Sequence, residues 1–181
     1  MDGLLAKTIV MLKAEFMKRN KGGSHIHEVI PVSPESLSID ERGLKMLHKF
    51  AESNSIYSAS YEMDILGDIC NVYEGDVNDY WLDSIKHDTS YTPFYPIWIL
   101  SAYGLVLESK NLGAKQVVDI GSGDGRIAYC AKMIGLQSYG IEIDENLVSL
   151  ENKISSSTGI DFQPIMADAT QFDYTSLGLT Q

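Results

Sequence analysis

The sequence predicts an α/β fold built around a parallel sheet, and two observations carry that prediction. From residue 91 onward, apolar runs of strand length alternate with segments of helical periodicity. Strand–helix–strand–helix–strand order at this spacing is typical of a doubly wound parallel sheet with right-handed crossovers. Before residue 91 most of the chain has helical patterning. We therefore expect a mainly helical N-terminal region over 1–90 and a sheet-bearing unit over 91–181.

Turn and cap residues bound the elements of the second unit. Pro96 can occupy the first turn of a helix whose apolar stripe runs from Ile97 to Leu107. Gly135 ends a later helix, and Asp144 is a good N-cap residue for the next one. From these signals we expect strands over 116–120, 138–143 and 160–166 and helices over 126–134 and 145–154.

The N-terminal region is patterned mainly as helices. Apolar residues at a spacing of three or four predict a helix over 4–20, and Ser38-Ile39-Asp40-Glu41 has the form of a capping box for a helix over 39–53. We further expect one short strand over 25–32 and two short helices, over 60–72 and, capped by Asp76, over 77–86.

Composition limits the functions open to the chain. The 181 residues include 14 Lys and Arg against 25 Asp and Glu, which gives a formal net charge of −11. This charge disfavours nucleic-acid binding, because contact with phosphates requires a basic face. No apolar run reaches the roughly 20 residues that span a bilayer, and the N-terminus lacks the basic region of a signal peptide. We expect a cytoplasmic protein with no membrane segment.

Neither the cysteines nor the histidines predict a metal site. Cys70 and Cys130 lie far apart in the sequence, and we expect both to be reduced, buried thiols. His25, His27 and Glu28 could supply ligands, but no Cys or His partner follows them at the usual spacing. We therefore expect no bound metal.

A glycine-rich loop follows the first expected strand of the sheet. Residues 119–126 read Asp-Ile-Gly-Ser-Gly-Asp-Gly-Arg. The glycines allow a sharp turn and close approach of a ligand, and the helix N-terminus beyond them suits a carboxylate or phosphate. A dinucleotide fingerprint would place a third glycine where Arg126 stands, and Asp119 would repel a pyrophosphate. The pattern favours a ligand with an amino and a carboxylate group over NAD.

Glu142 ends the second expected strand. In folds of this type an acid at this place accepts hydrogen bonds from ribose hydroxyls. We therefore expect Glu142 to hold a ribose through two hydroxyl hydrogen bonds, and Asp144 to cap the following helix rather than to bind ligand.

Three segments together resemble the class I S-adenosylmethionine-dependent methyltransferase family: 117–128, 139–144 and Ala167-Asp168-Ala169. The sequences of these segments are most similar to those of archaeal and histone-type protein lysine methyltransferases, and the resemblance covers 91–173. It implies S-adenosylmethionine as cofactor, with its methionine part at the glycine loop, its ribose at Glu142 and its adenine at Asp168 and Ala169. The full set of expected cofactor-binding residues is Tyr91, Asp119, Gly121, Ser122, Gly123, Gly125, Glu142, Asp168 and Ala169.

The resemblance also implies how the strands are arranged. The family has a seven-stranded, Rossmann-like sheet in the order 3-2-1-4-5-7-6, so the three strands expected here would take the order 3-2-1. Pro164 agrees with this, because an edge strand tolerates a missing N–H. Residues 116–181 hold only three strands, so we expect a partial sheet, truncated after the third strand. A second copy or a partner chain would cover its open edge.

The expected activity is methyl transfer to an undetermined acceptor, with protein lysine as one candidate. The alternatives are a non-catalytic cofactor-binding or scaffold protein and an NAD-type dehydrogenase. No residue stands out as a catalytic base. The remaining candidates near the methyl group are Tyr91, Tyr95 and the acidic stretch 62–88, which could also attract a basic acceptor.

Overall fold

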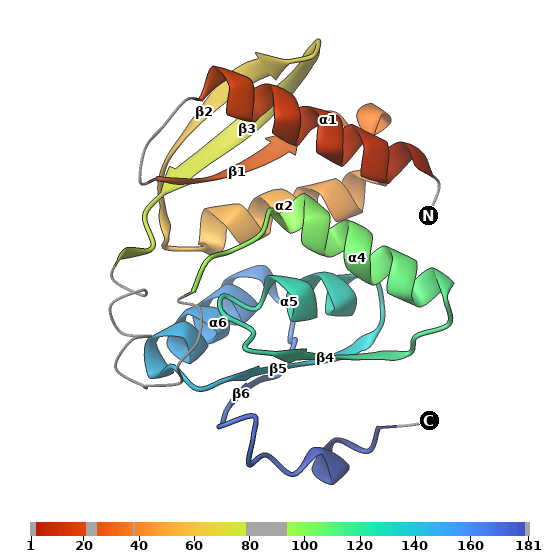
Figure 1. Ribbon diagram of the computed structural model, residues 1–181, viewed down its shortest axis with the longest axis vertical. Coiled ribbons are helices and arrows are strands. Elements are labelled where there is room, and N and C mark those ends of the chain that lie inside the picture. The colour runs from red at the N-terminus through yellow and green to blue at the C-terminus, as the bar shows by residue number, and fades with distance from the viewer. Residues whose placement is uncertain (1–2, 21–24, 38, 79–93, 180–181) are drawn as a thin grey trace.

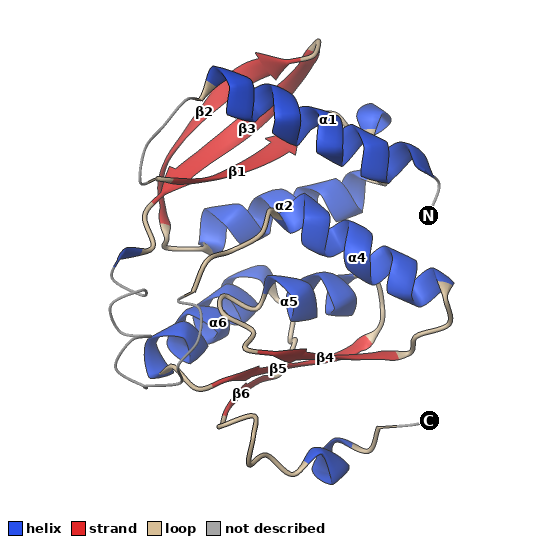
Figure 2. Cartoon of the chain, viewed as in Figure 1, coloured by secondary structure: helices blue, strands red, loops and turns tan. Residues whose placement is uncertain are grey.

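The computed structural model describes residues 3–20, 25–37, 39–78 and 94–179, which form two three-stranded sheets (Figures 1 and 2). The antiparallel sheet comes from the first part of the chain and the parallel sheet from the second. Helices α2, α4, α5 and α6 lie between the two sheets, and α1 packs beside the antiparallel one (Figure 2). The mixed α/β class and the parallel sheet expected from the sequence are confirmed.

The N-terminal part pairs two helices with an antiparallel sheet. Its elements are α1 (Gly3–Arg19), β1 (Ile26–Pro31), a 3-10 turn (Pro34–Ser36), α2 (Glu41–Ser53), β2 (Tyr57–Ile65) and β3 (Asp68–Gly75). The strand order is β1-β3-β2. The expected helices at 4–20 and 39–53 and the strand at 25–32 are confirmed. The N-cap of α2 is Asp40, whose side chain accepts a 2.6 Å hydrogen bond from Gly43 N.

The expected helix over 60–72 is wrong, and with it the mainly helical N-terminal region. These residues form a hairpin of β2 and β3, closed by Leu66 and Gly67, which have positive φ of 61° and 89°. Its β3 strand buries Cys70 and Val72 at the alternate spacing of a strand. Of the expected helix over 77–86, only Val77 and Asn78 lie within the described residues. Asp76 accepts a hydrogen bond from Asn78 N at 2.8 Å.

The second part alternates helices with parallel strands. Its elements are α4 (Ile99–Asn111), β4 (Gln116–Ile120), α5 (Arg126–Met133), β5 (Gln137–Glu142), α6 (Glu145–Thr158), β6 (Pro164–Met166) and a 3-10 turn (Tyr174–Leu177). The order is β4-β5-β6, so β5 lies in the centre. Two details differ from expectation. Helix α4 begins at Ile99, after Pro96, and β6 has only three residues, of which Pro164 is the first.

One hydrophobic cluster joins the two parts of the chain. It contains buried side chains from α1, α2 and the antiparallel sheet together with side chains from α4, α5 and α6. Phe50 of α2 lies 4.9 Å, centroid to centroid, from Tyr129 of α5, and the Tyr129 hydroxyl donates to Met46 O at 2.8 Å. The expected boundary at residue 90 lies outside the described residues. Across it, α2 packs directly on the helices that cover the parallel sheet.

Cys70 and Cys130 are buried, unpaired thiols, as expected. Among the helices that the structure describes, none combines the length and the apolar character needed to cross a membrane.

Candidate functional site

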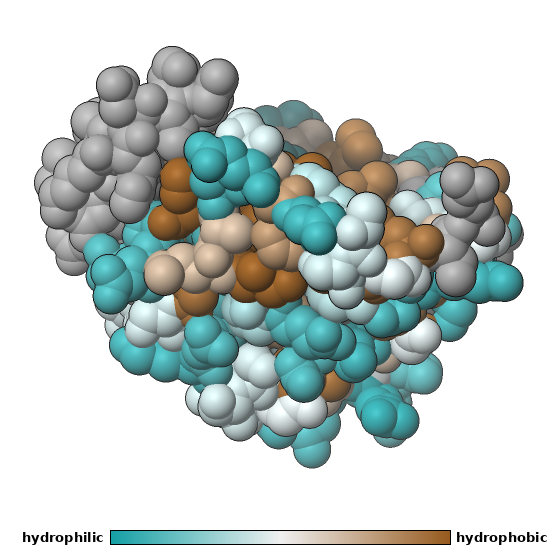
Figure 3. Space-filling view, turned by 90° about the horizontal axis from the view of Figure 1, so that it is seen from below, coloured by the Kyte–Doolittle hydropathy of each residue, from teal (hydrophilic) through white to brown (hydrophobic). Residues whose placement is uncertain are grey.

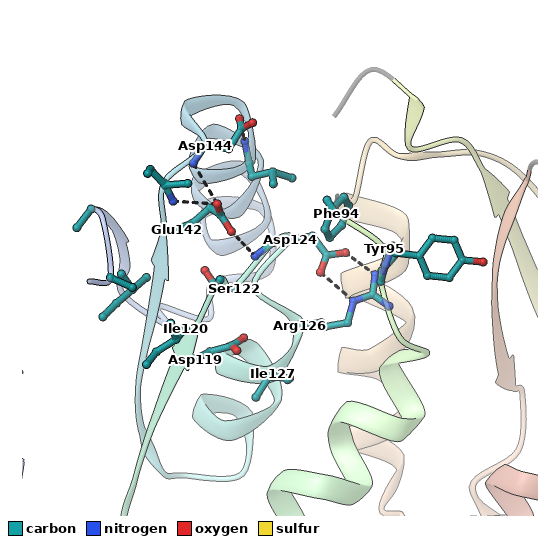
Figure 4. Close-up of a pocket in the computed structure, with 18 of the residues that line it drawn as sticks. Phe94, Tyr95, Asp119, Ile120, Ser122, Asp124, Arg126, Ile127, Glu142 and Asp144 are labelled. Atoms are coloured by element: carbon teal, nitrogen blue, oxygen red, sulfur yellow. Dashed lines mark hydrogen bonds and ion pairs between the residues drawn. The ribbon is translucent and has the colours of Figure 1, made fainter. Parts of the chain in front are cut away.

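A cleft of about 620 Å³ lies at the carboxyl ends of the parallel strands (Figure 4). Open parallel sheets bind their ligands at this end. One wall is the segment 94–97 that precedes α4, and another is the glycine loop after β4. Residues that follow β5 and β6 complete the lining.

The structure brings most of the predicted site residues together in this cleft: Asp119, Gly121, Ser122, Gly123, Glu142, Asp168 and Ala169. Gly125 lies behind the cleft as the N-cap residue of α5. Tyr91 lies outside the described residues. Tyr95 belongs to the lining, but its ring is 73% exposed and points away from the acids (Figure 4). The ligand contacts assigned to these residues stay predictions.

The three glycines of the loop each have a positive φ: 71° at Gly121, 63° at Gly123 and 76° at Gly125. Two of them are also closely packed. A Cβ at Gly123 would lie 2.6 Å from the Phe94 ring, and one at Gly125 would lie 2.4 Å from the Phe162 ring. A Cβ at Gly121 would meet nothing within 4 Å. Gly121 is therefore where the loop backbone borders open space, and a ligand can approach it.

Glu142 fastens the glycine loop to the end of β5. Its buried carboxylate accepts hydrogen bonds from Gly123 N at 2.9 Å, Ile143 N at 2.8 Å and Asp144 N at 3.0 Å (Figure 4). A carboxylate offers about four lone-pair positions. Backbone amides therefore occupy most of the lone-pair positions of Glu142. About one position, on the oxygen facing Gly123, remains for a hydroxyl group. This differs from the two ribose hydrogen bonds expected from the sequence.

Asp119 lies near the end of β4, just before the glycines of the loop, and pairs with Gly140 of β5. Burial raises the pKa of Asp119 to about 6, and the negative charges of Asp124 and Glu142 add to the effect. The carboxylate is therefore ionised at neutral pH but is held at a free-energy penalty. A ligand ammonium group at this place would relieve that penalty.

Asp168 and Ala169 follow β6 in a hydrogen-bonded turn. The Asp168 carboxylate accepts from Thr170 N at 2.8 Å, from the Thr170 hydroxyl at 2.7 Å and from Gln171 Nε2 at 3.0 Å. The bonds from Thr170 lower the pKa of Asp168. The Tyr174 hydroxyl donates to Ala169 O at 2.8 Å, which leaves the backbone of this turn well defined.

Sequence reasoning missed a buried polar network beside the loop, two members of which, Asp124 and Arg126, also belong to the lining of the cleft. Asp124 and Arg126 pair with each other, and they also contact Glu28 of β1 and Asn54 at the end of α2. In the sequence, Arg126 stands out only as a departure from the dinucleotide fingerprint. A signal was present, since Glu28 stands in a short strand whose neighbours on the same face, Ile26 and Ile30, are apolar. A partner almost a hundred positions away cannot, however, be read from local spacing.

Glu151 of α6 was also missed. Its side chain is fully buried, and neither carboxyl oxygen has a hydrogen-bond partner among the described residues. One oxygen would lie 2.9 Å from a Cβ built on either Gly125 or Gly140, so the carboxyl sits directly behind the loop. Burial raises the pKa of Glu151 to about 8; the nearby Ser122 hydroxyl opposes the rise, and the charges of Glu142, Asp124 and Asp119 add to it. At neutral pH this group is mainly protonated.

Comparison with known proteins gives a limited result. No protein-family model and no curated protein matches the sequence. Among solved structures, a candidate RNA methyltransferase from Pyrococcus horikoshii is 21% identical with a TM-score of 0.35, and the match covers 41% of this chain and 37% of that one. TehB from Haemophilus influenzae is 17% identical with a TM-score of 0.33, and the match covers 56% and 32%. The match therefore spans about a third of either structure, and similarity at this level carries no functional conclusion.

Proposed function

We propose that the chain forms the cofactor-binding part of an S-adenosylmethionine-dependent methyltransferase. The observation that supports this best is the glycine loop, which turns through three positive-φ glycines between Asp119 and Glu142. These acids stand at the carboxyl ends of neighbouring parallel strands, and a Cβ at Gly121 in the loop after β4 would meet nothing within 4 Å. The arrangement suits a ligand that carries a cationic amino-acid group at one end and a hydroxylated sugar further along.

The residues of the cleft fit the groups of this cofactor. The ionised Asp119 carboxylate is suited to an ammonium group, and the open backbone at Gly121 to close approach by the amino-acid part. The remaining acceptor position on Glu142 suits one ribose hydroxyl. Asp168 and Ala169 lie in the lining beyond Glu142, where the adenine would rest. A pyrophosphate fits poorly, because Asp119, Asp124 and Glu142 gather negative charge around the loop.

When bound, S-adenosylmethionine supplies a methyl group attached to a sulfonium sulfur. The task of the protein is then to hold the acceptor in line with that methyl group and to exclude water. In the described part of the cleft, Phe94 packs against Gly123 and Ile97 continues the same wall, so this side is apolar. We assign the acceptor to this side of the cleft. None of the described lining residues is assigned as a base.

We propose lysine in a basic protein segment as the acceptor. The formal net charge of −11 favours a cationic over a polyanionic partner. Glu62 and Asp64 lie exposed on β2, outside the described lining of the cleft, so part of the acidic stretch 62–88 is accessible to such a partner at a distance from the methyl group. Methyl transfer to a lysine-rich peptide, with an arginine-rich peptide and RNA as comparison substrates, tests this choice.

Isothermal titration with S-adenosylhomocysteine tests the proposed cofactor site. Glu142→Ala removes the acceptor for the sugar and for the Gly123 amide, and should weaken binding by about 1–3 kcal/mol, roughly 5- to 150-fold. Glu145→Ala is the matched control, because Glu145 is an exposed glutamate in the first turn of α6. It should bind as the wild type does, and thermal unfolding of both variants establishes that they are folded.

The outcomes separate the candidate functions. Absence of binding by folded wild-type protein would overturn the proposal, and enhanced NADH fluorescence on binding would point to a dehydrogenase instead. Binding without transfer to any of the three acceptors would support the non-catalytic alternative.

A further inference from the structure

We propose that Arg126 is a positioning residue of the glycine loop, and that through Glu28 and Asn54 it makes the N-terminal part of the chain a working component of the cofactor site. The inference rests on the proposed function only for the identity of the ligand. It goes beyond that function because it assigns a role to Glu28, Asn54 and Tyr57, which are absent from the described lining of the cleft, and so to a region outside the parallel sheet.

The first step is that every N–H donor of the Arg126 guanidinium has an acceptor. Arg126 is buried, with only 4% of its surface exposed. Nε donates to Asp124 Oδ1 at 2.8 Å and Nη2 to Asp124 Oδ2, so the pair is bidentate. Nη1 donates to Glu28 Oε2 at 3.0 Å and to Ile97 O, and Nη2 also donates to the Tyr57 hydroxyl at 3.3 Å. A guanidinium has five N–H donors, and these contacts use all five.

The second step links Arg126 to the loop through Asp124. Asp124 lies between Gly123 and Gly125, and its side chain is 1% exposed and turned toward Arg126 (Figure 4). Its Oδ2 also accepts from Asn54 Nδ2 at 2.8 Å, and Asn54 is the C-cap residue of α2. Because Arg126 holds both carboxylate oxygens and Asn54 holds one of them from outside the loop, the peptide between Gly123 and Gly125 should have one preferred orientation. That orientation directs Gly123 N to Glu142.

The third step links Arg126 to the antiparallel sheet through Glu28 of β1. Glu28 is fully buried, and its Oε1 accepts from Ile99 N at 2.8 Å, at the start of α4. Its Oε2 accepts from Arg126 and from the Tyr57 hydroxyl of β2 at 3.3 Å. Burial raises the pKa of Glu28 to about 7, and the Arg126 charge opposes the rise. Glu28 is absent from the described lining of the cleft, so it can influence a ligand only through Arg126 and α4.

A side chain that only filled the space of Arg126 could not replace it, because the network depends on its charge and its hydrogen bonds. Removal of one partner from a buried ion pair leaves the other charge uncompensated. Here the uncompensated group would be Asp124, whose negative charge already raises the pKa of Asp119 in the cleft. A lysine at position 126 would keep the charge but could not form the bidentate contact or reach five acceptors. A change at Glu28 removes one of the acceptors of Arg126, and its effect should reach the loop through the Arg126–Asp124 pair.

Titration of S-adenosylhomocysteine into Glu28→Gln and Arg126→Lys tests the coupling. Each variant should bind more weakly than wild type by about 2- to 30-fold. The double variant should be weakened by less than the product of the two single effects, because both act along one path. Glu15→Gln and Arg19→Lys are matched controls, since this Glu–Arg pair on α1 has a contact of 2.9 Å, close to the 3.0 Å between Arg126 and Glu28, but lies at the surface. They should stay within twofold of wild type.

A second measurement does not depend on the ligand. The amide resonances of Gly121, Gly123 and Gly125 in ¹H–¹⁵N spectra should shift in Glu28→Gln and, if that variant fails to fold, in the milder Tyr57→Phe, which removes only the hydroxyl shared by Glu28 and Arg126. A structural role confined to the N-terminal part would leave these amides unchanged. Unchanged amides in a folded variant, or affinities within twofold of wild type, overturn the inference. If wild type does not bind the ligand at all, the proposed function fails and the amide shifts alone decide the coupling.

Discussion

The carboxyl group of Glu151 lies directly behind the glycine loop, and from its raised pKa we predict how stability depends on pH. In the unfolded chain this carboxyl titrates at about 4.5, whereas burial holds the pKa in the folded protein at about 8. The unfolded state therefore releases the proton first, and the free energy of unfolding falls as the pH rises from 4.5 toward 8. Glu151→Gln removes this titration. The free energy of unfolding of the variant, relative to that of the wild type, should therefore be higher at pH 8 than at pH 5 by on the order of 3 kcal/mol.

Urea unfolding at a series of pH values between 5 and 8 measures this difference. Glu145→Gln on the same helix is the control, because its side chain is exposed. A stability gain that is the same at every pH would show that Glu151 is not the titrating group.

Gly125 offers a separate test of close packing at the loop. Gly125 and Gly159 have nearly the same φ, 76° and 74°, but a Cβ at Gly125 would overlap Phe162 and Glu151, whereas one at Gly159 would meet nothing within 4 Å. Gly159→Ala should cost about 1–2 kcal/mol from backbone strain alone. Gly125→Ala carries the same strain plus the steric overlap, about 1–3 kcal/mol more. Denaturant unfolding of both variants gives the difference, and equal losses would contradict the packing described here.

At the level of elements, the β2–β3 hairpin has an unusual turn. Positive φ at both central residues is typical of a type I′ turn, in which Asn-Gly is preferred, yet here the first position is Leu66, 50% exposed. Leu66→Asn should stabilise the protein by about 1 kcal/mol, because asparagine tolerates the left-handed region better. The control is Leu112→Asn, since Leu112 is 81% exposed but has φ of −79°. Thermal or urea unfolding that shows equal changes in both variants would refute the turn assignment.

At the level of the whole molecule, the two edges of the parallel sheet differ. Strand β6 is short and begins with Pro164, both of which discourage pairing with another chain. Strand β4 has no such protection in the described part of the chain, and it pairs only with β5. Seen from the side of this sheet opposite the helices, apolar surface is interspersed with hydrophilic surface (Figure 3). Ile120 and Met166, at the ends of β4 and β6, are 60% and 62% exposed.

We therefore expect the chain to self-associate through β4. Val117 packs against the core, so strand alternation places Val118 on the opposite face. Val118→Lys puts a charge beside the edge and should weaken association, whereas Leu112→Lys at the end of α4 should not. Sedimentation equilibrium over a range of concentrations measures this. Association that is unchanged in Val118→Lys would place the contact elsewhere.

Features of the fold and of the site that depend on residues close in sequence could be predicted, and those that depend on residues far apart in sequence could not. The path from β4 through the loop to α6 is specified locally, because Gln116–Ile120 is an apolar strand, the glycines mark the turn and Asp144 caps the helix. The convergence of Asp119, Glu142 and Asp168 follows from parallel strands ending at one edge. The β2–β3 hairpin was missed because β2 is largely exposed and so carries no apolar alternation. The distant partners of Arg126, Glu28 of β1 and Tyr57 of β2, were missed because local spacing carries no information about them.

The contact between Glu28 and Arg126 joins residues 98 positions apart, and this separation has a consequence for folding. Contacts between residues so distant in sequence form slowly, because a long segment must first be brought together. The β4–α5–β5 segment is built from residues near one another in sequence, whereas the contacts of Asp124 with Asn54 and of Arg126 with Glu28 require that the end of α2 and β1 have docked. A ligand that needs the finished loop would therefore recognise only chains that have completed folding, and its binding would report on the last step of that process.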